Sequence, residues 1–488
     1  MLDAGDNTVA AELGRRGFLA AGASFLASAL VSGVVSPAMA EGKRSPNIVY
    51  IMADDLGWKD LGFHGSDIHT PVLDVLAKSG MQFDEFYAQP MCTPSRAAFL
   101  TGRYPLRYGL QSGVIPSAGG YGLAADEYLL PQLLKDNGYE TALVGKWHLG
   151  HGKTEYWPRQ RGFDHFYGAL VGEIDHFKHA SHGVRDWYRN NKPLVEKGYD
   201  NTLFGKEAAR LIRERNNDKP LFLYLAFTAP HSPFQAPEDY VKRYAHIADE
   251  QRRLYAAMVT AMDDAVGHVL KALDETGQRE NTVIVFQSDN GGVRSALFAG
   301  ESKVGDNLPA DNGPYREGKG TLYEGGTRVA GFMNWPGHIK PGVMQGLSHV
   351  VDMFPTLAAM AGAKVETHKP LDGMNLWPAI SEGTRTPREE VVYNVDPTGG
   401  AVREGDMKLV WQAGLPGKVE LFDIAKDPSE TKNLAEQNPE VVKKLQERIV
   451  ALSKEMAPPL LVMEAIKLTF GAPPVAADPS SMFNELGD

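Results

Sequence analysis

Four short apolar runs, each followed by strongly polar residues, constrain the fold of this chain more than any other feature of the sequence. The runs cover residues 46–52, 139–145, 221–227 and 281–286. Runs of this length are typical of buried parallel strands, which helices cover on both faces. The polar residues that follow them are Asp54 and Asp55, Lys146 and His148, His231, and Asp289 and Asn290. Ligands of α/β sheets bind at the carboxyl ends of strands, so the pattern predicts one polar site at one sheet edge.

The single cysteine of the chain, Cys92, lies in the stretch Cys92-Thr93-Pro94-Ser95-Arg96. A lone cysteine cannot form an intrachain disulfide, so it is core filler, a reactive thiol or a modified residue. Pro94 suits the first turn of a helix and Thr93 can cap it, which places Cys92 just before the helix N-terminus. Backbone N–H groups and Arg96 would attract an anion there, and we expect them to favour the thiolate.

Length and charge narrow the class of protein further. A chain of 488 residues exceeds one average domain, so we expect a large α/β domain and a smaller one. The formal net charge of −11 disfavours a nucleic-acid partner, which would call for a basic face. An anion site in such a chain must depend on local positive charge, and Lys319, between two glycines, is a further candidate for it.

The first 40 residues are typical of an export signal. Arg15 and Arg16 precede an apolar run of small residues, and Ala38-Met39-Ala40 fits a signal-peptidase site. The twin arginine is typical of Tat signals, which export folded proteins. We therefore predict a periplasmic or secreted protein without a stable membrane anchor, whose transient partners include the Tat export machinery.

The sequence pattern changes after Pro387 from long alternating helices and strands to short strands, which indicates the smaller domain. Its pattern predicts four short strands joined by glycine-rich turns, at residues 390–393, 401–403, 407–411 and 419–423. A helix at residues 439–454 follows them. The domain boundaries predicted here are 1–40 for the signal peptide, 41–386 for the catalytic domain and 387–488 for the C-terminal subdomain and tail. Residues 249–277 predict a long amphipathic helix.

The motifs together identify a family resemblance. The stretch from Cys92 to Arg96, followed by Thr101-Gly102-Arg103, resembles the sulfatase signature. Three other segments are similar to sulfatase motifs: 145–150, 289–292 and 317–326. The chain is identified as a member of the formylglycine-dependent type I sulfatases, arylsulfatase B-like, in the alkaline phosphatase superfamily. The resemblance implies a large, mostly parallel sheet sandwiched by helices, with a smaller C-terminal subdomain of antiparallel sheet plus helix.

The same resemblance implies the chemistry. A formylglycine-generating enzyme would oxidise Cys92 to formylglycine, whose hydrate attacks sulfur and forms a covalent sulfoenzyme intermediate. The implied Ca²⁺ ligands are Asp54, Asp55, Asp289, Asn290 and residue 92, mostly hard oxygen donors. By similarity, His231 and Lys319 bind sulfate and protonate the leaving oxygen, and Lys146 and His148 orient the formylglycine. Arg96 would stabilise charge on the sulfate oxygens.

Several alternatives remain open at this stage. Sulfate esters of small aryl alcohols and of saccharides both fit the motifs. A phosphate or phosphonate ester hydrolase of the same superfamily would need similar groups around its substrate. A non-catalytic periplasmic protein that binds sulfated glycans or calcium would keep Cys92 as a thiol. Residues 173–188 are expected to line the mouth of the cleft, with His179 and Trp187 contacting substrate.

Overall fold

A computed structural model describes residues 45–299, 308–366, 369–413 and 416–470, all of which lie in the unit from Ser45 onward. The predicted signal peptide, residues 1–40, lies outside the described residues. None of the described helices is long and apolar enough to cross a membrane.

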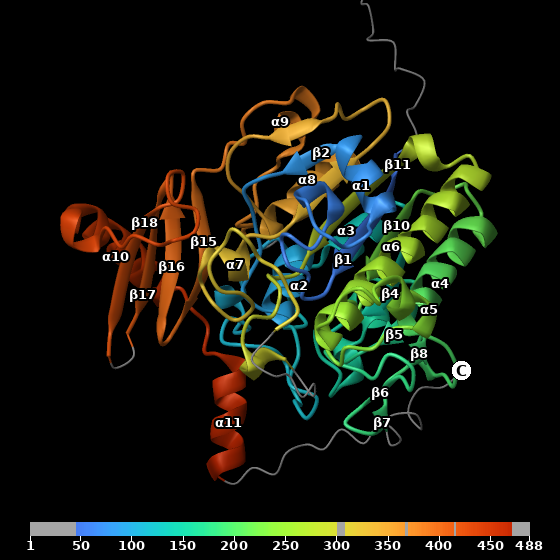
Figure 1. Ribbon diagram of the computed structural model, residues 1–488, viewed down its shortest axis with the longest axis horizontal. Helices are drawn as coiled ribbons and strands as arrows, with labels where there is room; N and C mark the ends of the chain where they lie inside the picture. Colours follow the sequence, from blue (N-terminus) through green and yellow to red (C-terminus); the bar gives the residue numbers. More distant parts are fainter. Residues whose placement is uncertain (1–44, 300–307, 367–368, 414–415, 471–488) are drawn as a thin grey trace, which may run out of the picture. The chain divides into compact units, whose positions relative to one another are not determined.

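A ten-stranded sheet forms the centre of the described unit (Figure 1). In spatial order its strands are β13 (Gly342–Met344), β2 (Met81–Phe83), β12 (Gly331–Asn334), β11 (Thr282–Ser288), β1 (Asn47–Ala53), β10 (Leu221–Ala226), β4 (Glu140–Lys146), β5 (His165–Ala169), β8 (Tyr188–Arg189) and β9 (Lys192–Pro193). The five from β11 to β5 are parallel to one another. Four of these five are the predicted apolar runs, so the mostly parallel sheet is confirmed.

Helices cover both faces of this sheet because both faces are apolar. Along β1, Ile48, Tyr50 and Met52 share one hydrophobic cluster, and Val49 and Ile51 belong to a second. On the first face lie α2 (Cys92–Thr101), α3 (Leu130–Asp136) and α8 (Met353–Met360); on the second lie α1 (Pro71–Lys78), α4 (Asp200–Glu214) and α6 (Glu250–Glu275). Shorter elements complete this region: α5 (Glu238–Arg243), α9 (Trp377–Glu382), β3 (Phe86–Tyr87), β14 (Ser348–His349), β6 (Ala180–Ser181) and β7 (Val184–Arg185).

The helix predicted over 249–277 is α6, and its ends and partners follow from its polar residues. The Asp249 carboxylate accepts a hydrogen bond from the Arg252 N–H and caps the helix. Asp263, in the middle of α6, accepts from the backbone N–H groups of Val72 and Leu73 at 3.1 and 2.8 Å. Its carboxylate therefore satisfies the first turn of α1 and ties the two helices together.

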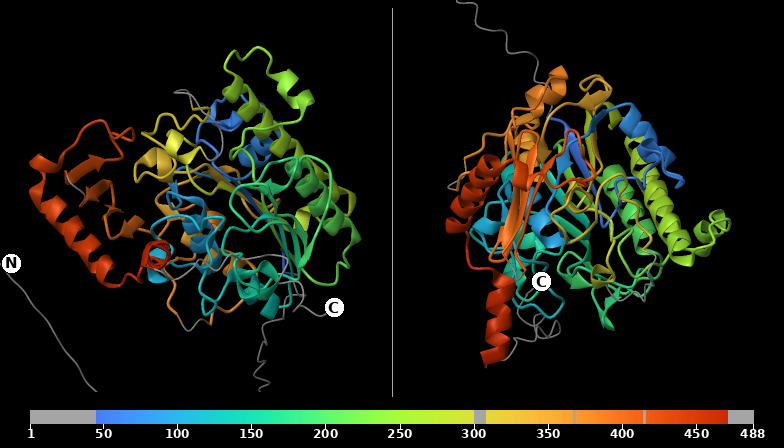
Figure 2. Two further views of the ribbon diagram at one scale, coloured as in Figure 1. Left: turned by 90° about the horizontal axis from the view of Figure 1, so that it is seen from below. Right: turned by 60° about the vertical axis from the view of Figure 1, so that its left-hand side comes forward.

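A second, antiparallel sheet forms the predicted C-terminal subdomain. Its strands in order are β15 (Glu390–Asp396), β16 (Gly399–Glu404), β17 (Met407–Gln412) and β18 (Lys418–Asp423). Helix α10 (Pro439–Lys454) packs along one face, as Figure 2 shows. The other face contributes Tyr393, Val410 and Phe422 to a cluster with Tyr87 and Tyr323.

A buried ion network joins the small sheet to the large domain. The Lys408 Nζ on β17 lies 2.9 Å from Glu324 Oε1, in α7 (Glu324–Thr327), and 2.8 Å from Glu430 Oε1. All three side chains have no measurable exposure. Burial alone would raise the pKa of Glu324, but the charges of Lys408 and neighbouring arginines lower it to about 2. Each charge in this network therefore depends on the others.

Two local features differ from the sequence-based expectations. Helix α2 begins at Cys92 itself, and Met91 is its N-cap residue. Thr93 does not cap it, because its hydroxyl donates to the His148 carbonyl and accepts from the Ile115 N–H. Helix α11 (Leu460–Phe470) was not predicted.

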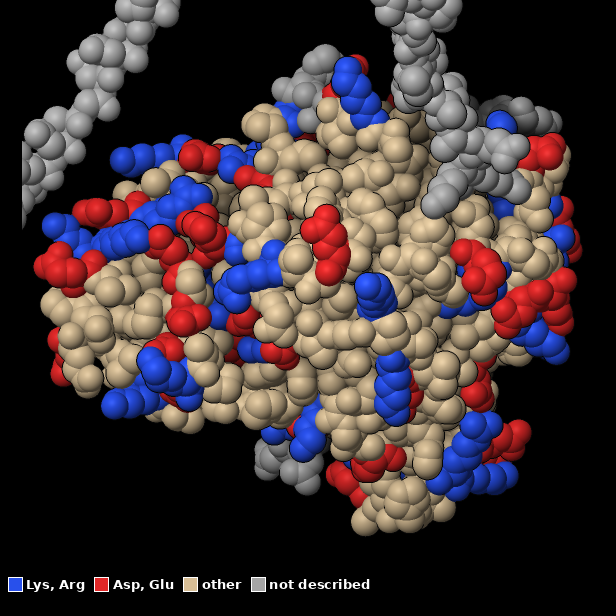
Figure 3. Space-filling model, turned by 90° about the horizontal axis from the view of Figure 1, so that it is seen from above, with Lys and Arg blue, Asp and Glu red and all other residues tan. Residues whose placement is uncertain are grey.

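The outer surface carries both signs of charge. On the face seen in Figure 3, Lys and Arg side chains are interspersed with Asp and Glu, and no large field of one sign develops. The net charge of −11 is therefore not gathered into a single patch on this face.

Replacing Lys408 by methionine should destabilise the protein by about 3–5 kcal/mol, because two buried carboxylates would lose their shared cation. Lys444→Met is the matched control, since Lys444 pairs with Glu404 at the surface and should cost less than about 1 kcal/mol. Denaturant midpoints of both variants measure the difference. Equal midpoints for the two variants would show that the network does not hold the sheets together.

Candidate active site

Ten predicted side chains converge at the carboxyl edge of the parallel strands. They are Asp54, Asp55, Cys92, Arg96, Lys146, His148, His231, Asp289, Asn290 and Lys319, and none is more than 7% exposed. The four strand ends supply seven of them, which is the arrangement expected from the apolar runs. Cys92 and Arg96 come from α2, and Lys319 from the loop before α7.

The carboxylates of Asp54 and Asp55 divide their oxygens between the cysteine and two lysines. Their Oδ1 atoms lie 3.4 and 3.9 Å from Cys92 Sγ. Lys146 Nζ donates to Asp54 Oδ2 at 2.6 Å, and Lys319 Nζ donates to Asp55 Oδ2 at 2.8 Å. One oxygen of each carboxylate therefore faces the first residue of α2, while a cation holds the other.

Arg96 and Asp289 form the third ion pair of the site. Arg96 donates from Nε and Nη2 to Asp289 Oδ2 at 3.0 and 2.8 Å, and its Nη2 lies 3.5 Å from Asp54 Oδ1. A third hydrogen bond runs from Nη1 to the Lys146 carbonyl. Since Lys146 and Lys319 pair with the other two carboxylates, three buried acids face three buried bases, as low-polarity surroundings require.

Burial and these pairs set the protonation of the acids. Burial alone would raise the pKa of Asp54, but the charges of Lys146 and Arg96 hold it well below its usual range. Burial, with the charge of Asp54, raises the pKa of Asp289 to about 6. The pKa values of Asp54 and Asp289 therefore shift in opposite directions, because their surroundings differ.

The side chains around Cys92 do not by themselves favour the expected thiolate. Burial and the charge of Asp289 raise the pKa of the Cys92 thiol well above its usual value, and the two lysines do not offset them. An unmodified Cys92 would therefore be a protonated thiol and a weak nucleophile.

Two histidines are fixed by backbone carbonyls. The His148 Nε2 lies 3.0 Å from the Ile115 carbonyl, and the His231 Nδ1 lies 2.7 Å from the Ser232 carbonyl. A carbonyl can only accept, so these nitrogens carry the protons. The opposite nitrogen of His148, Nδ1, has no partner among the described residues, whereas that of His231, Nε2, lies 3.5 Å from Asp55 Oδ2. Burial lowers the pKa of both rings, with further lowering by Lys146 at His148 and by Lys319 at His231. Both imidazoles are therefore neutral.

The backbone leaves the extended conformation of β4 at His148, which has a φ of 57°. The N–H groups of Trp147 and His148 still bond to the Ala169 and Leu170 carbonyls at the end of β5. The His148 ring lies against Gly172, where a Cβ atom would lie 2.1 Å from Cε1. A residue without a side chain at position 172 leaves the space for the ring.

The donor set fits a hard divalent cation. Asn290 Oδ1 is buried and accepts no hydrogen bond from any described residue, which is rare for a buried amide oxygen. Ligand atoms of Asp54, Asp55, Cys92 and His231 lie within 4.8 Å of one another. Carboxylate and amide oxygens suit Ca²⁺ or Mg²⁺. Asp289, predicted as a ligand, offers Oδ2 to Arg96, and its Oδ1 accepts from the Asp55 N–H.

A polar chain behind His231 was not foreseen as part of the site. His176 Nε2 lies 3.1 Å from the His231 carbonyl, and its Nδ1 lies 2.8 Å from Asp200 Oδ2. The Thr228 hydroxyl donates to the same Asp200 oxygen at 2.6 Å. The pairing of His176 with a residue of α4 depends on tertiary packing, which no local sequence pattern reports.

His179 and Trp187 do not line a cleft, contrary to expectation. Their exposed fractions are 1% and 0%, and their rings stack with centroids 4.0 Å apart. Trp187 also stacks on Phe204 of α4. Trp187 belongs to the hydrophobic cluster that contains Phe204, and His179 packs on it.

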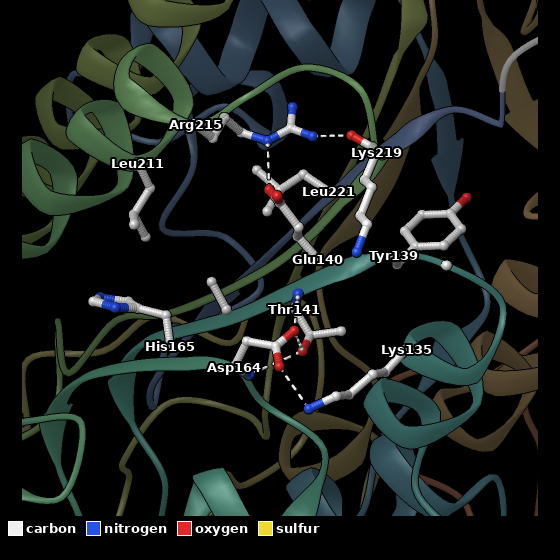
Figure 4. A pocket seen from close by; sticks show the side chains of 12 residues that line it. Lys135, Tyr139, Glu140, Thr141, Asp164, His165, Leu211, Arg215, Lys219 and Leu221 are labelled. Atoms are coloured by element: carbon white, nitrogen blue, oxygen red, sulfur yellow. Dashed lines mark hydrogen bonds and ion pairs between the residues drawn. The ribbon is translucent and has the colours of Figure 1, made fainter. Parts of the chain in front are cut away.

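A hollow lies at the opposite ends of β4 and β10, and charged side chains that line it pair with one another (Figure 4). In it, Lys135 pairs with Asp164 at 2.5 Å and Arg215 with Glu140 at 3.1 Å. The Thr141 hydroxyl bonds to the same aspartate. This hollow lies at the amino edge of the sheet, away from the converging strand ends.

Comparison with known protein families gives two matches. The family model described as Sulfatase matches residues 46–363, and the model described as N-sulphoglucosamine sulphohydrolase, C-terminal, matches residues 317–455. Together they span the central sheet, the converging side chains and the C-terminal sheet with α10.

Individual relatives agree with the family models. The chain is 35% identical to Arylsulfatase J of Mus musculus, over 86% of this chain and 77% of that protein. It is 35% identical to N-acetylgalactosamine-6-sulfatase of Homo sapiens, over 72% of this chain and 69% of that protein. Among solved structures, Ps i-CgsB in complex with k-i-k-neocarrahexaose is similar with a TM-score of 0.79 and 32% identity, covering 91% of this chain and 100% of that one.

Proposed function

The chain belongs to the sulfatase family and is a sulfuric ester hydrolase, and we propose that it acts through a formylglycine made from Cys92, together with a bound Ca²⁺. The observation that carries this proposal is the position of Cys92. It is the first residue of a fully buried helix, and its Sγ faces two carboxylates that lysines hold in place. A protonated thiol would be a poor nucleophile there, whereas a hydrated aldehyde would supply both an attacking hydroxyl and a second hydroxyl to expel sulfate.

The proposed metal ligands are Asp54, Asp55, Asp289 and Asn290, with residue 92 once it carries oxygen. The unpartnered Asn290 Oδ1 and the Oδ1 atoms facing Cys92 support this set. When bound, the cation supplies positive charge to the sulfate oxygens. The lysines on the Oδ2 atoms of Asp54 and Asp55 hold both carboxylates in position.

The cationic and imidazole groups then have separate roles in the proposal. Arg96, fixed by Asp289, stabilises charge that develops on the sulfate oxygens. Lys319 carries the proton for the leaving oxygen, and His231, whose Nδ1 is bound to a carbonyl, places its Nε2 beside that ammonium, near the same Asp55 oxygen. Lys146 and His148 orient residue 92, and the free Nδ1 of His148 takes up the proton when sulfate is released.

Relatives support a sulfated alcohol as substrate and include both aryl and sugar sulfatases by name. One is called an arylsulfatase, another acts on N-acetylgalactosamine-6-sulfate by its name, and a related structure holds a neocarrahexaose. We propose a saccharide sulfate as the physiological class, with small aryl sulfates as usable surrogates.

Conversion of Cys92 predicts a mass change. The tryptic peptide that contains residue 92 should appear about 18 Da lighter as the free aldehyde. Cys92→Ala should keep the fold, because little volume is removed, and should lose nearly all turnover of an aryl sulfate. Its thermal midpoint serves as the control for folding. Substantial sulfatase activity in Cys92→Ala, or an unmodified peptide in fully active protein, would refute the proposal.

Kinetics on an aryl sulfate and an aryl phosphate with the same aryl group distinguish this proposal from a phosphate ester hydrolase. We expect the purified enzyme to cleave the sulfate ester with the higher kcat/KM. A higher kcat/KM on the phosphate would favour the alternative.

The metal assignment predicts stoichiometric Ca²⁺ in the purified protein. Asn290→Leu, which is close to isosteric but has no oxygen, should reduce Ca²⁺ affinity by at least about tenfold, since a hard oxygen ligand is lost. Elemental analysis and calorimetric titration measure content and affinity. Stoichiometric zinc, with activity lost on its removal alone, would overturn the assignment.

We also propose export by the Tat route from Arg15 and Arg16, with delivery to the periplasm. Replacing both arginines with lysine should leave active enzyme in the cytoplasm, because the signal and not the catalytic fold is altered. Fractionation of cells measures the distribution. Unchanged periplasmic activity would exclude this route.

A further inference from the structure

The segment that carries His231 is held at its backbone by two neighbouring elements. It covers residues 228–232, after β10, and we call it the His231 segment. The Asp54 N–H, just after β1, donates to the Ala229 carbonyl at 3.0 Å. The Ala229 N–H donates to Asn201 Oδ1, near the start of α4, at 3.1 Å. These two bonds fix residue 229, and His231 lies two residues further along.

His176 holds the backbone of residue 231 itself. Its Nε2 lies 3.1 Å from the His231 carbonyl. The other contacts of His231 are local, since its N–H donates to the Thr228 carbonyl at 3.0 Å and its Nδ1 to the Ser232 carbonyl at 2.7 Å. The bond from His176 therefore ties residue 231 to a segment outside its own turn.

His176 is in turn clamped to the first residue of α4. The Asp200 N–H donates to the His176 carbonyl at 3.0 Å, and the His176 Nδ1 lies 2.8 Å from Asp200 Oδ2. The His176 N–H donates to Gln235 Oε1 at 3.0 Å. His176 is 1% exposed and Asp200 is 0% exposed. Both backbone groups and both ring nitrogens of His176 are thus engaged, so the ring cannot turn without the loss of a hydrogen bond.

The surroundings of the His176 ring favour its charged form. Its Nδ1 faces a carboxylate and its Nε2 faces a carbonyl, and both of these groups accept hydrogen bonds. Burial alone would lower the pKa of His176, but the charge of Asp200 and the hydrogen bond to it raise this pKa above its usual value. A charged donor forms a stronger hydrogen bond than a neutral one, so an imidazolium holds the His231 carbonyl firmly.

The position of His231 matters because its ring shares an oxygen with the lysine that protonates the leaving group in the proposed function. His231 Nε2 lies 3.5 Å from Asp55 Oδ2, and Lys319 Nζ lies 2.8 Å from the same atom. A displacement of residue 231 would therefore change the surroundings of the ammonium. Small displacements of catalytic groups have large effects on rate.

We propose that His176, clamped by Asp200, is a positioning residue that holds His231 beside the Lys319 ammonium at the leaving oxygen. The inference rests on the proposed roles of His231 and Lys319. It assigns a function in the reaction to a buried histidine that lies behind the site and does not itself touch the reacting atoms.

Two substitutions of His176 separate its two side-chain contacts. In His176→Gln, the amide nitrogen reaches the position of Nε2 and can still donate to the His231 carbonyl. In His176→Asn, the amide nitrogen reaches only the position of Nδ1 and donates to Asp200. Asp200 keeps hydrogen bonds from Asn201 and Thr228 in both variants, so we expect both to fold. Thermal midpoints check this expectation.

The dependence of kcat/KM on the leaving group is the measurement, with a series of aryl sulfates whose phenols differ in acidity. For His176→Asn, kcat/KM should fall about twofold with the most acidic phenol and about tenfold with the least acidic, because a poor leaving group depends most on protonation. His176→Gln should recover most of this loss. A purely structural role would lower kcat/KM by the same factor for every ester.

His179→Asn is the matched control. His179 is also 1% exposed, and its Nε2 lies 3.1 Å from a backbone carbonyl, that of Gly198. This bond does not involve the His231 segment, so the substitution should leave the leaving-group dependence unchanged. Equal losses on all esters for His176→Asn, or the same losses in His176→Gln, would overturn the proposal.

Asp200→Asn tests the clamp without a change to His176. The substitution keeps the shape and removes the negative charge, so it should steepen the leaving-group dependence in the same direction as His176→Asn. An unchanged dependence in Asp200→Asn would show that the clamp does not act on the reaction.

His231→Asn distinguishes a failure of this inference from a failure of the proposed function. It should steepen the leaving-group dependence at least as much as His176→Asn does. An unchanged dependence in His231→Asn would refute the proposed role of His231 and the inference with it. A steeper dependence in His231→Asn but not in His176→Asn would refute the inference alone and leave the proposed function intact.

Discussion

The fold depends on the mutual neutralisation of buried charges at the carboxyl edge of the parallel strands. Asp54, Asp55 and Asp289 end two neighbouring strands in surroundings from which water is excluded. Each would be costly alone, but Lys146, Lys319 and Arg96 arrive from three other segments to pair with them. The ion pairs that form the site are thus the same contacts that hold these segments of the domain together.

A second group of buried charges neutralise one another at the boundary between the two sheets. Lys408 lies between Glu324 and Glu430, and Glu324 begins the short helix α7 that follows the Lys319 loop. The C-terminal sheet therefore does more than extend the domain. By holding α7, it holds the loop that presents Lys319 to Asp55.

The central sheet, α6 and the C-terminal strands were predictable because their apolar periodicity reports burial directly. The strand ends could be predicted as one site, since parallel strands place their carboxyl ends together. Thr93 was misassigned because a hydroxyl near a helix start can cap it or, as here, bond to His148 from a distant segment. His179 and Trp187 were misassigned because a loop rich in aromatic residues has no periodicity to reveal a core.

Burial of Cys92 sets an order of events in the life of the chain. In the folded protein the residue is 1% exposed, and every residue of its helix is buried around it. On the proposed chemistry, a modifying enzyme needs the segment extended and accessible. Modification and folding are then in kinetic competition: a chain that closes first is well folded, stable and permanently inactive. The yield of active protein is decided by relative rates during synthesis, and not by the stability of the finished structure.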